Sequence, residues 1–276
     1  MTAYFNIGTF RKGPYKTFST DTYFRWMTNY GFANNTIILY TDLEDLAIKF
    51  RLKRSKFPNY MTKVFLVKQD DFWGFRLKSK IKAVFEQPGY PQYFPNTVFE
   101  PYSCAMHVKY DVIERVITER IIQTKYVAWL DIGYFRGKEK EMFTLYTPQD
   151  IKDDHISFLQ IKAFYNLSPK TIIDDNALWV AGGIFIGRPE YLLLFVEDYR
   201  TAVEGMIDMK LMSTDQQVLY TMYSHLSPFQ PRVPIQRYHS KNRLMWFYLG
   251  DLCREESLIL ARKTKTMYEV VTSYFY

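Results

Sequence analysis

The sequence predicts an α/β fold with a mixed, mostly parallel sheet flanked by helices, and a single domain spanning residues 1–276. Short runs rich in β-branched and aromatic residues alternate with longer segments of helical periodicity. The run TIILY at 36–40 is apolar throughout, as in strands that are buried on both faces. No internal repeat, linker or low-complexity segment divides the chain, and α/β enzymes often reach this length undivided.

The amino-terminal elements alternate in the order that a parallel sheet requires. Ser19, Thr20 and Asp21 are candidates to cap the first helix, and Gly8 ends the first strand. We expect strands at 4–7, 36–40 and 63–67 and helices at 19–30 and 43–53.

The later elements continue the pattern with longer helices. A stripe of Ile113, Val116, Ile117 and Ile121 at helical spacing supports a helix over 102–123. We expect strands at 126–130, 142–146, 156–160 and 178–186, helices at 192–206 and 213–226, and an irregular, aromatic and basic remainder.

Composition narrows the class of protein. Aromatic residues make up 18% of the chain, enough to line clefts as well as the core, and a formal charge of +7 favours anionic partners. The basic residues are scattered and form no nucleic-acid-binding motif. Two cysteines exclude a disulfide framework. With no signal peptide and no apolar stretch long enough to span a membrane, we expect a cytoplasmic protein.

Several familiar nucleotide and metal signatures are missing from the sequence. It contains no GxGxxG after the first strand, no Walker A sequence and no HExxH. Dinucleotide dehydrogenases, P-loop NTPases and zinc proteases are therefore disfavoured.

The most informative residue is Asp131, at the end of the predicted strand YVAWL. Open α/β sheets bind ligands at the carboxyl ends of their strands, where a carboxylate can hold Mn²⁺ or Mg²⁺ beside a diphosphate. The alternative is that Asp131 caps a turn before Gly133. Asp174 and Asp175 are a second candidate for a metal site.

Three further segments carry candidate residues. Gly182 and Gly183 lie inside a predicted strand, where glycines permit close approach of a ligand or simply tight packing. Asp215 opens a helix, where an acidic residue also suits the helix dipole. The third segment contains a possible metal ligand, His239, and two possible phosphate ligands, Lys241 and Arg243, although a lone histidine is more often structural.

Two stretches, YVAWLDIGYFR at 126–136 and WVAGG at 179–183, resemble the HtrL/YibB family, which is grouped with GT-A-like glycosyltransferases. The segment IGTFRKG at 7–13 resembles the donor-entry loop of GT-A enzymes. In size and composition the chain is also similar to compact glycosyltransferases of large algal viruses, including a xylosyltransferase; a viral origin would place it in the host cytoplasm. The resemblance implies a Rossmann-like GT-A fold, a nucleotide-sugar donor and a divalent cation, Mn²⁺ or Mg²⁺.

The resemblance also implies roles for individual residues. Asp131 matches the first aspartate of the DxD motif, whereas Gly133 stands in place of the second, so the motif is incomplete. Asp215 matches the position of the catalytic base. The implied donor-binding residues are Thr9, Arg11, Asp131, Gly133, Lys241 and Arg243; the metal ligands are Asp131 and His239; and the acceptor-binding residues are Trp179, Gly182 and Gly183.

We therefore expect an enzyme that transfers a sugar, xylose being one candidate, from a UDP- or GDP-sugar to a hydroxyl of an oligosaccharide or glycoprotein, with inversion. Two alternatives stay open. The chain could instead be a non-catalytic, carbohydrate-binding relic of such an enzyme, or it could be a basic nucleic-acid-binding protein. The first alternative predicts sugar binding without turnover, and the second predicts a strongly salt-dependent affinity for nucleic acid.

Overall fold

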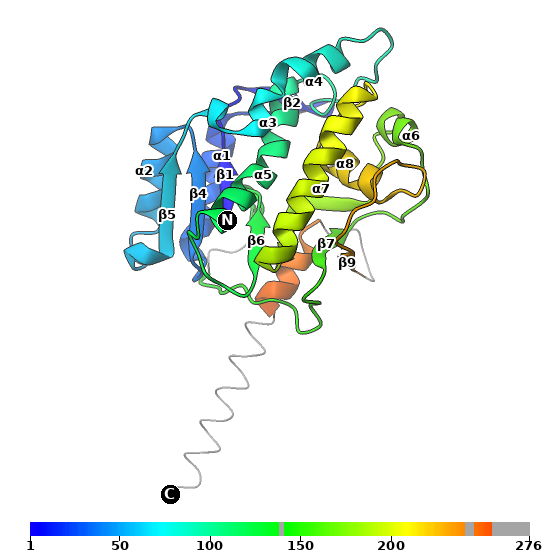
Figure 1. The fold of residues 1–276 in the computed structure, drawn as a ribbon. Helices are drawn as coiled ribbons and strands as arrows, with labels where there is room; N and C mark the ends of the chain where they lie inside the picture. The colour runs from blue at the N-terminus through cyan, green and yellow to red at the C-terminus, as the bar shows by residue number, and fades with distance from the viewer. Residues whose placement is uncertain (138–140, 241–245, 256–276) are drawn as a thin grey trace, which may run out of the picture.

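The computed structural model describes residues 1–137, 141–240 and 246–255, and contains two sheets of three and four strands that lie side by side (Figure 1). The first is parallel and has the order β1-β4-β5; the second has the order β6-β8-β7-β9. Their strands are β1 (Thr2–Tyr4), β4 (Ile37–Thr41), β5 (Thr62–Leu66), β6 (Val127–Leu130), β7 (Ile156–Gln160), β8 (Val180–Gly187) and β9 (Ile235–Tyr238).

Main-chain hydrogen bonds join the two sheets at β1 and β6. The Met1 nitrogen donates to the Ala128 carbonyl at 2.6 Å, and the Leu130 nitrogen donates to the Met1 carbonyl at 2.9 Å. This is the bonding pattern of parallel neighbours. The strands therefore follow the order β5-β4-β1-β6-β8-β7-β9, with β8 antiparallel to both β6 and β7. The prediction of a mixed α/β protein is confirmed.

This strand order creates a switch point between β1 and β6. From β1 the chain builds β4 and β5 on one side, and it then returns to build β6 and the remaining strands on the other side. In open α/β sheets, ligands bind in the crevice outside the carboxyl ends of the strands at such a point. Asp131 directly follows β6 and therefore lies at this crevice.

Helices cover both faces of the sheet (Figure 1). The strand β4 shows the division, because Ile38 and Tyr40 pack with one hydrophobic cluster while Ile37 and Leu39 pack with the other. Side chains of α5 (Glu100–Thr118), α7 (Pro189–Asp208) and α8 (Asp215–Tyr223) belong to the first cluster; those of α1 (Thr20–Met27), α2 (Glu44–Lys53) and the helical residues 248–255 belong to the second.

Shorter elements complete the described chain. An antiparallel hairpin of β2 and β3 follows β1, and it folds beside the carboxyl end of that strand. The short elements are β2 (Phe10–Lys12), β3 (Lys16–Phe18), α3 (Trp73–Arg76), α4 (Lys78–Phe85), α6 (Pro169–Asp174) and the 3₁₀ turns η1 (Thr28–Phe32), η2 (Asn59–Met61) and η3 (Gln69–Asp71).

Several predicted boundaries differ from the structure. The first strand covers 2–4 rather than 4–7, and the segment 142–146 makes an isolated bridge, Ala33 to Phe143, instead of a strand. The strand β9 lies in a region predicted to be irregular. It forms because it pairs in parallel with β7, a long-range contact that leaves no signal in the local sequence. Among the described helices, none combines the length and the apolar character that crossing a bilayer requires.

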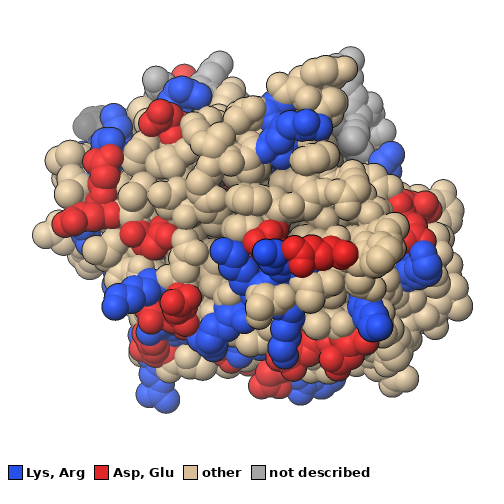
Figure 2. Space-filling view, turned by 90° about the horizontal axis from the view of Figure 1, so that it is seen from above, with Lys and Arg blue, Asp and Glu red and all other residues tan. Residues whose placement is uncertain are grey.

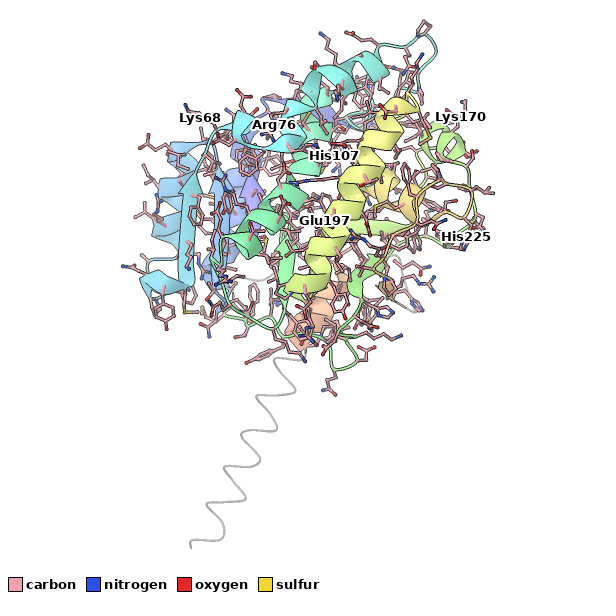
Figure 3. The ribbon with its side chains drawn as sticks, viewed as in Figure 1. Lys68, Arg76, His107, Lys170, Glu197 and His225 are labelled. Carbon is pink, nitrogen blue, oxygen red and sulfur yellow. The ribbon has the colours of Figure 1, made fainter. Side chains whose placement is uncertain are left out.

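A buried histidine lies between α5 and α7. Figure 3 labels this residue, His107. Its Nδ1 is 2.7 Å from Tyr199 Oη, and its Nε2 is 3.3 Å from Ser103 Oγ. Burial, together with the nearby Lys109 charge, lowers the pKa of His107 to about 3. The folded protein therefore keeps this imidazole neutral at pH values where the unfolded chain, with a pKa near 6.5, is protonated.

This depressed pKa predicts a loss of stability on the acidic side of neutrality. Between pH 6.5 and 3 the unfolded state binds one more proton at His107, so stability falls as the pH is lowered. From pH 7 to pH 5, His107 should account for a loss of about 2 kcal/mol in unfolding free energy. Urea unfolding at pH 7 and at pH 5 tests this expectation. Between these pH values, the unfolding free energy of His107→Gln should fall by about 2 kcal/mol less than that of the wild type. Equal decreases would contradict the depressed pKa of His107.

Candidate functional site

A cavity of about 630 Å³ opens at the switch point between β1 and β6. Its walls come from the carboxyl ends of these two strands, the β2–β3 hairpin, α1 and the first half of α5. The volume lies within the range of sites for small molecules and cofactors. The fold therefore places a ligand-sized cavity where its topology predicts one.

The cavity is lined by aromatic rings and cations. Eight aromatic side chains contribute to the wall, among them Phe18, Trp26 and Tyr102. Within the described residues, five cationic side chains and one carboxylate, that of Asp131, line it. The cations are Lys12, Lys16, Arg25, Lys109 and Arg136. Such a wall suits an anion that also carries a flat ring or a sugar, because cations pair with phosphate oxygens and aromatic faces pack against rings.

The centre of the site is a buried lysine. Lys109 Nζ donates to Asp215 Oδ2 at 2.8 Å and to the Gly182 carbonyl at 2.9 Å, and it lies 3.2 Å from Asp131 Oδ1. Its side chain is 2% exposed. Burial opposes the charged form of Lys109, but the two carboxylates outweigh this and raise its pKa above the ordinary value. Lys109 therefore favours the ammonium form, which donates two hydrogen bonds and forms an ion pair with Asp131.

Gly182 makes this arrangement possible. A Cβ at this position would lie 2.0 Å from Asp215 Oδ2 and 3.1 Å from Lys109 Nζ, so a residue larger than glycine would displace the Asp215 carboxylate. Gly182 is the third residue of β8. Because β8 is antiparallel to β6, this amino-terminal part of β8 lies beside the carboxyl end of β6. The paired glycines thus bring the strand close to Lys109 and Asp215.

Asp131 is held rigidly with its carboxylate at the cavity. Its main-chain nitrogen donates to the Gly183 carbonyl at 2.8 Å, and its carbonyl accepts from Tyr30 Oη at 2.8 Å. Its Oδ1 accepts from Trp129 Nε1 at 2.8 Å. The side chain remains 37% exposed, in contrast to the 3% of Asp215. Asp131 is therefore the carboxylate of this site that a ligand can reach.

The packing around Gly133 leaves no room for a second aspartate. A Cβ at this position would lie 2.5 Å from the Trp26 ring, which lines the same cavity. A second aspartate could be accommodated only if Trp26 moved. In this chain, the Trp26 indole occupies the space that a side chain at position 133 would need.

The hairpin after β1 presents different residues to the cavity from those predicted. Because side chains alternate along a strand, Phe10 and Lys12 face the cavity while Arg11 faces away and lies 4.1 Å from the Phe94 ring centroid. Lys12 Nζ donates to Tyr102 Oη at 3.2 Å. Thr9 precedes β2 and is exposed. The cations that the hairpin gives to this site are Lys12 on β2 and Lys16 on β3.

The other predicted residues have varied surroundings. Trp179 is 4% exposed and packs against Phe164, Tyr220 and Tyr223, so stacking on an acceptor sugar would require these rings to move. Asp174 and Asp175 lie at the end of α6. Lys241 and Arg243 lie outside the described residues.

The comparison with protein families agrees with the two segments that carried the resemblance. The profile described as "Bacterial protein of unknown function (HtrL_YibB)" matches residues 1–229, which include the whole cavity wall. The chain belongs to the HtrL_YibB family. No curated protein matches the sequence.

In this HtrL_YibB protein, the two metal ligands that the resemblance implies, Asp131 and His239, follow strands that are not neighbours in the sheet. His239 is exposed and follows β9, three strands from β6, a separation of about 14 Å at the usual strand spacing. Asp131 already lies beside the Lys109 ammonium. Among the described residues, no group of three histidine, cysteine or acidic side chains is arranged to hold a metal ion. Among the described residues, the implied cation thus finds one carboxylate on the cavity wall, and that carboxylate already shares the Lys109 ammonium with Asp215.

On the face of this HtrL_YibB protein seen in Figure 2, acidic and basic side chains are interspersed, and other residue types cover much of the middle. Mixed charges of this kind are typical of an ordinary solvated surface rather than a continuous basic track. Five cations of the described chain line the cavity wall; Lys109 is buried and the other four are exposed.

Several site residues were missed by sequence reasoning. Lys109 lies on a helix whose sequence gives no sign that this lysine is buried. Arg25 and Trp26 on α1 are far in the chain from Arg136, with which they line the cavity. One signal was present. Alternation along residues 10–12 would have identified Lys12 if the segment had been interpreted as a strand.

Proposed function

We propose that this protein is a glycosyltransferase that uses a nucleotide-sugar donor, with the cavity between β1 and β6 as its active site. The observation that carries the proposal is the composition of that cavity: five cations and one accessible carboxylate beside aromatic rings, at the switch point of an α/β sheet. A nucleoside diphosphate sugar supplies the matching parts, since its base and sugar are flat or ring-shaped and its diphosphate carries the negative charge.

The cationic side chains would bind and stabilise the diphosphate. Arg136 is fixed by a hydrogen bond from its Nη1 to the Gly133 carbonyl at 2.9 Å, and it lies over the Trp26 and Phe247 rings. Lys12 is positioned by Tyr102. When the bond between the anomeric carbon and the diphosphate oxygen breaks, the electron pair passes to the diphosphate. Fixed cations then stabilise the charge that develops there.

A carboxylate would accept the proton of the acceptor. The acceptor oxygen forms the new bond to the anomeric carbon and loses its proton to a base, which typically accelerates such a step by about 10²–10⁴-fold. Asp131 is the carboxylate that supports this role best, because it is exposed to the cavity. Asp215, predicted from the resemblance, stays a candidate, but it needs Lys109 to move aside. Inversion and the identity of the sugar remain predictions.

A panel of UDP- and GDP-sugars tests the proposal directly. Calorimetric binding together with release of UDP or GDP is the expected result. Binding without release, with or without an oligosaccharide acceptor, would favour the carbohydrate-binding relic. Failure of every nucleotide sugar and nucleotide diphosphate to bind would refute the proposal, and a steeply salt-dependent affinity for DNA or RNA would replace it.

Two neighbouring cations on the hairpin provide a matched pair of variants. Lys12→Met should weaken binding of the nucleotide diphosphate by about tenfold, because a charge-assisted hydrogen bond contributes about 1.5–3 kcal/mol. Arg11→Met removes the same charge from the opposite face of β2 and should change the affinity by less than about twofold. Isothermal titration measures both; the reverse result would restore Arg11 as the donor-binding residue.

A further inference from the structure

The buried lysine has surroundings that are usual for a metal ion. Lys109 Nζ is enclosed by Asp215 Oδ2 at 2.8 Å, the Gly182 carbonyl at 2.9 Å and Asp131 Oδ1 at 3.2 Å. Two carboxylates and a main-chain carbonyl are oxygen ligands of the kind that Mg²⁺ and Mn²⁺ prefer. In this chain an ammonium from α5 occupies the position between them.

A divalent cation on Asp131 Oδ1 would have to lie close to this ammonium. Metal–oxygen distances of about 2.1 Å would place an ion bound to Asp131 Oδ1 no more than about 5 Å from Lys109 Nζ. The two positive charges would repel each other in a site that water only partly screens. The other described cavity cations, Lys12, Lys16, Arg25 and Arg136, increase this repulsion.

We infer that Lys109 is a built-in counterion for Asp131 and Asp215. This site would therefore bind its nucleoside diphosphate through lysine and arginine side chains, without a divalent cation on Asp131. The inference rests on the proposed function. Lys109 is a positioning residue here: it holds Asp215 by a hydrogen bond and Asp131 by an ion pair, while the cations at the cavity mouth contact the diphosphate. Asp131 is then available to hydroxyl groups instead of a metal.

The first test is binding of UDP and GDP to the full chain in EDTA and in Mn²⁺. The dissociation constant of the nucleotide that binds should change by less than about threefold between the two conditions, because its phosphate charge is matched by the protein. An affinity at least tenfold weaker in EDTA would overturn the inference and leave the glycosyltransferase proposal standing. If neither nucleotide binds in either condition, the proposed function itself fails.

The second test needs no nucleotide. Mn²⁺ alone, followed by its free-ion electron paramagnetic resonance signal, should not bind the wild-type protein at Asp131. Lys109→Met has a side chain of similar length without the charge, and it leaves two carboxylates and a carbonyl facing one vacated position. This variant should bind Mn²⁺ at least tenfold more tightly than the wild type, because these oxygens are suitable ligands.

Two controls make this result interpretable. Lys12→Met removes a cation from the cavity mouth and should weaken UDP or GDP binding without any comparable gain in Mn²⁺ affinity. The single variant Asp131→Asn, with Lys109 unchanged, shows whether any Mn²⁺ that the wild-type protein binds is held by Asp131. Loss of such binding in Asp131→Asn would overturn the inference, whether or not Lys109→Met folds.

Discussion

Asp131→Asn should reduce sugar transfer by at least about a hundredfold, since it removes the carboxylate that takes the acceptor proton. The amide keeps the size of the side chain and can still accept from Trp129 Nε1. Lys109 retains its shorter ion pair with Asp215. The variant should therefore fold and bind the nucleotide diphosphate with an affinity close to that of the wild type, so that the loss appears in turnover rather than in binding.

The matched variant Asp215→Asn separates the two candidates for the base. Asp215 is 3% exposed and is the closest partner of a buried ammonium, so its loss should destabilise the protein by about 3–5 kcal/mol. Thermal unfolding and transfer assays on both variants decide the assignment. If Asp215→Asn stays stable and binds donor but loses transfer while Asp131→Asn retains it, the base is Asp215 and the sequence-based assignment is right.

The features that the sequence predicted well are those encoded locally. The apolar run at 36–40 and the run ending at Leu130 became β4 and β6, because continuous apolar residues favour strands buried on both faces. Asp131 then lies at the carboxyl end of β6 by simple chain continuity. The candidate residue that depended on one strand end thus lies beside a cavity, and its role stays a prediction.

The features that the sequence could not predict depend on long-range packing. Lys109 becomes a central residue of the site because α5 crosses above Gly182 and Asp215, which lie more than 70 residues further along the chain. Trp179 looked like a sugar-stacking residue, but the rings of α8 and the Phe164 segment enclose it. Both cases depend on which segments meet in space, and single-sequence periodicity carries no such information.

Gly182→Ala should be among the most damaging small substitutions in this protein. Its added Cβ would lie 2.0 Å from Asp215 Oδ2, well inside contact distance, and the neighbouring Ala181 is paired with Leu159 of β7. Asp215 would have to move away from Lys109, leaving a buried ammonium without its closest carboxylate. Separating a buried pair in this way costs about 3–5 kcal/mol, a large part of the stability of an ordinary domain.

The neighbouring glycine provides the control. At Gly183 an added Cβ would lie 3.3 Å from the Tyr134 ring and 3.7 Å from Asp131 Oδ2, contacts that a shift of a few tenths of an ångström relieves. Gly183→Ala should therefore cost about 1 kcal/mol, the typical effect of a single substitution. Urea unfolding of the two variants should separate them clearly. If both variants lost the same small amount of unfolding free energy, Asp215 could move without breaking its ion pair with Lys109. The inference that Lys109 is a fixed counterion would then be wrong.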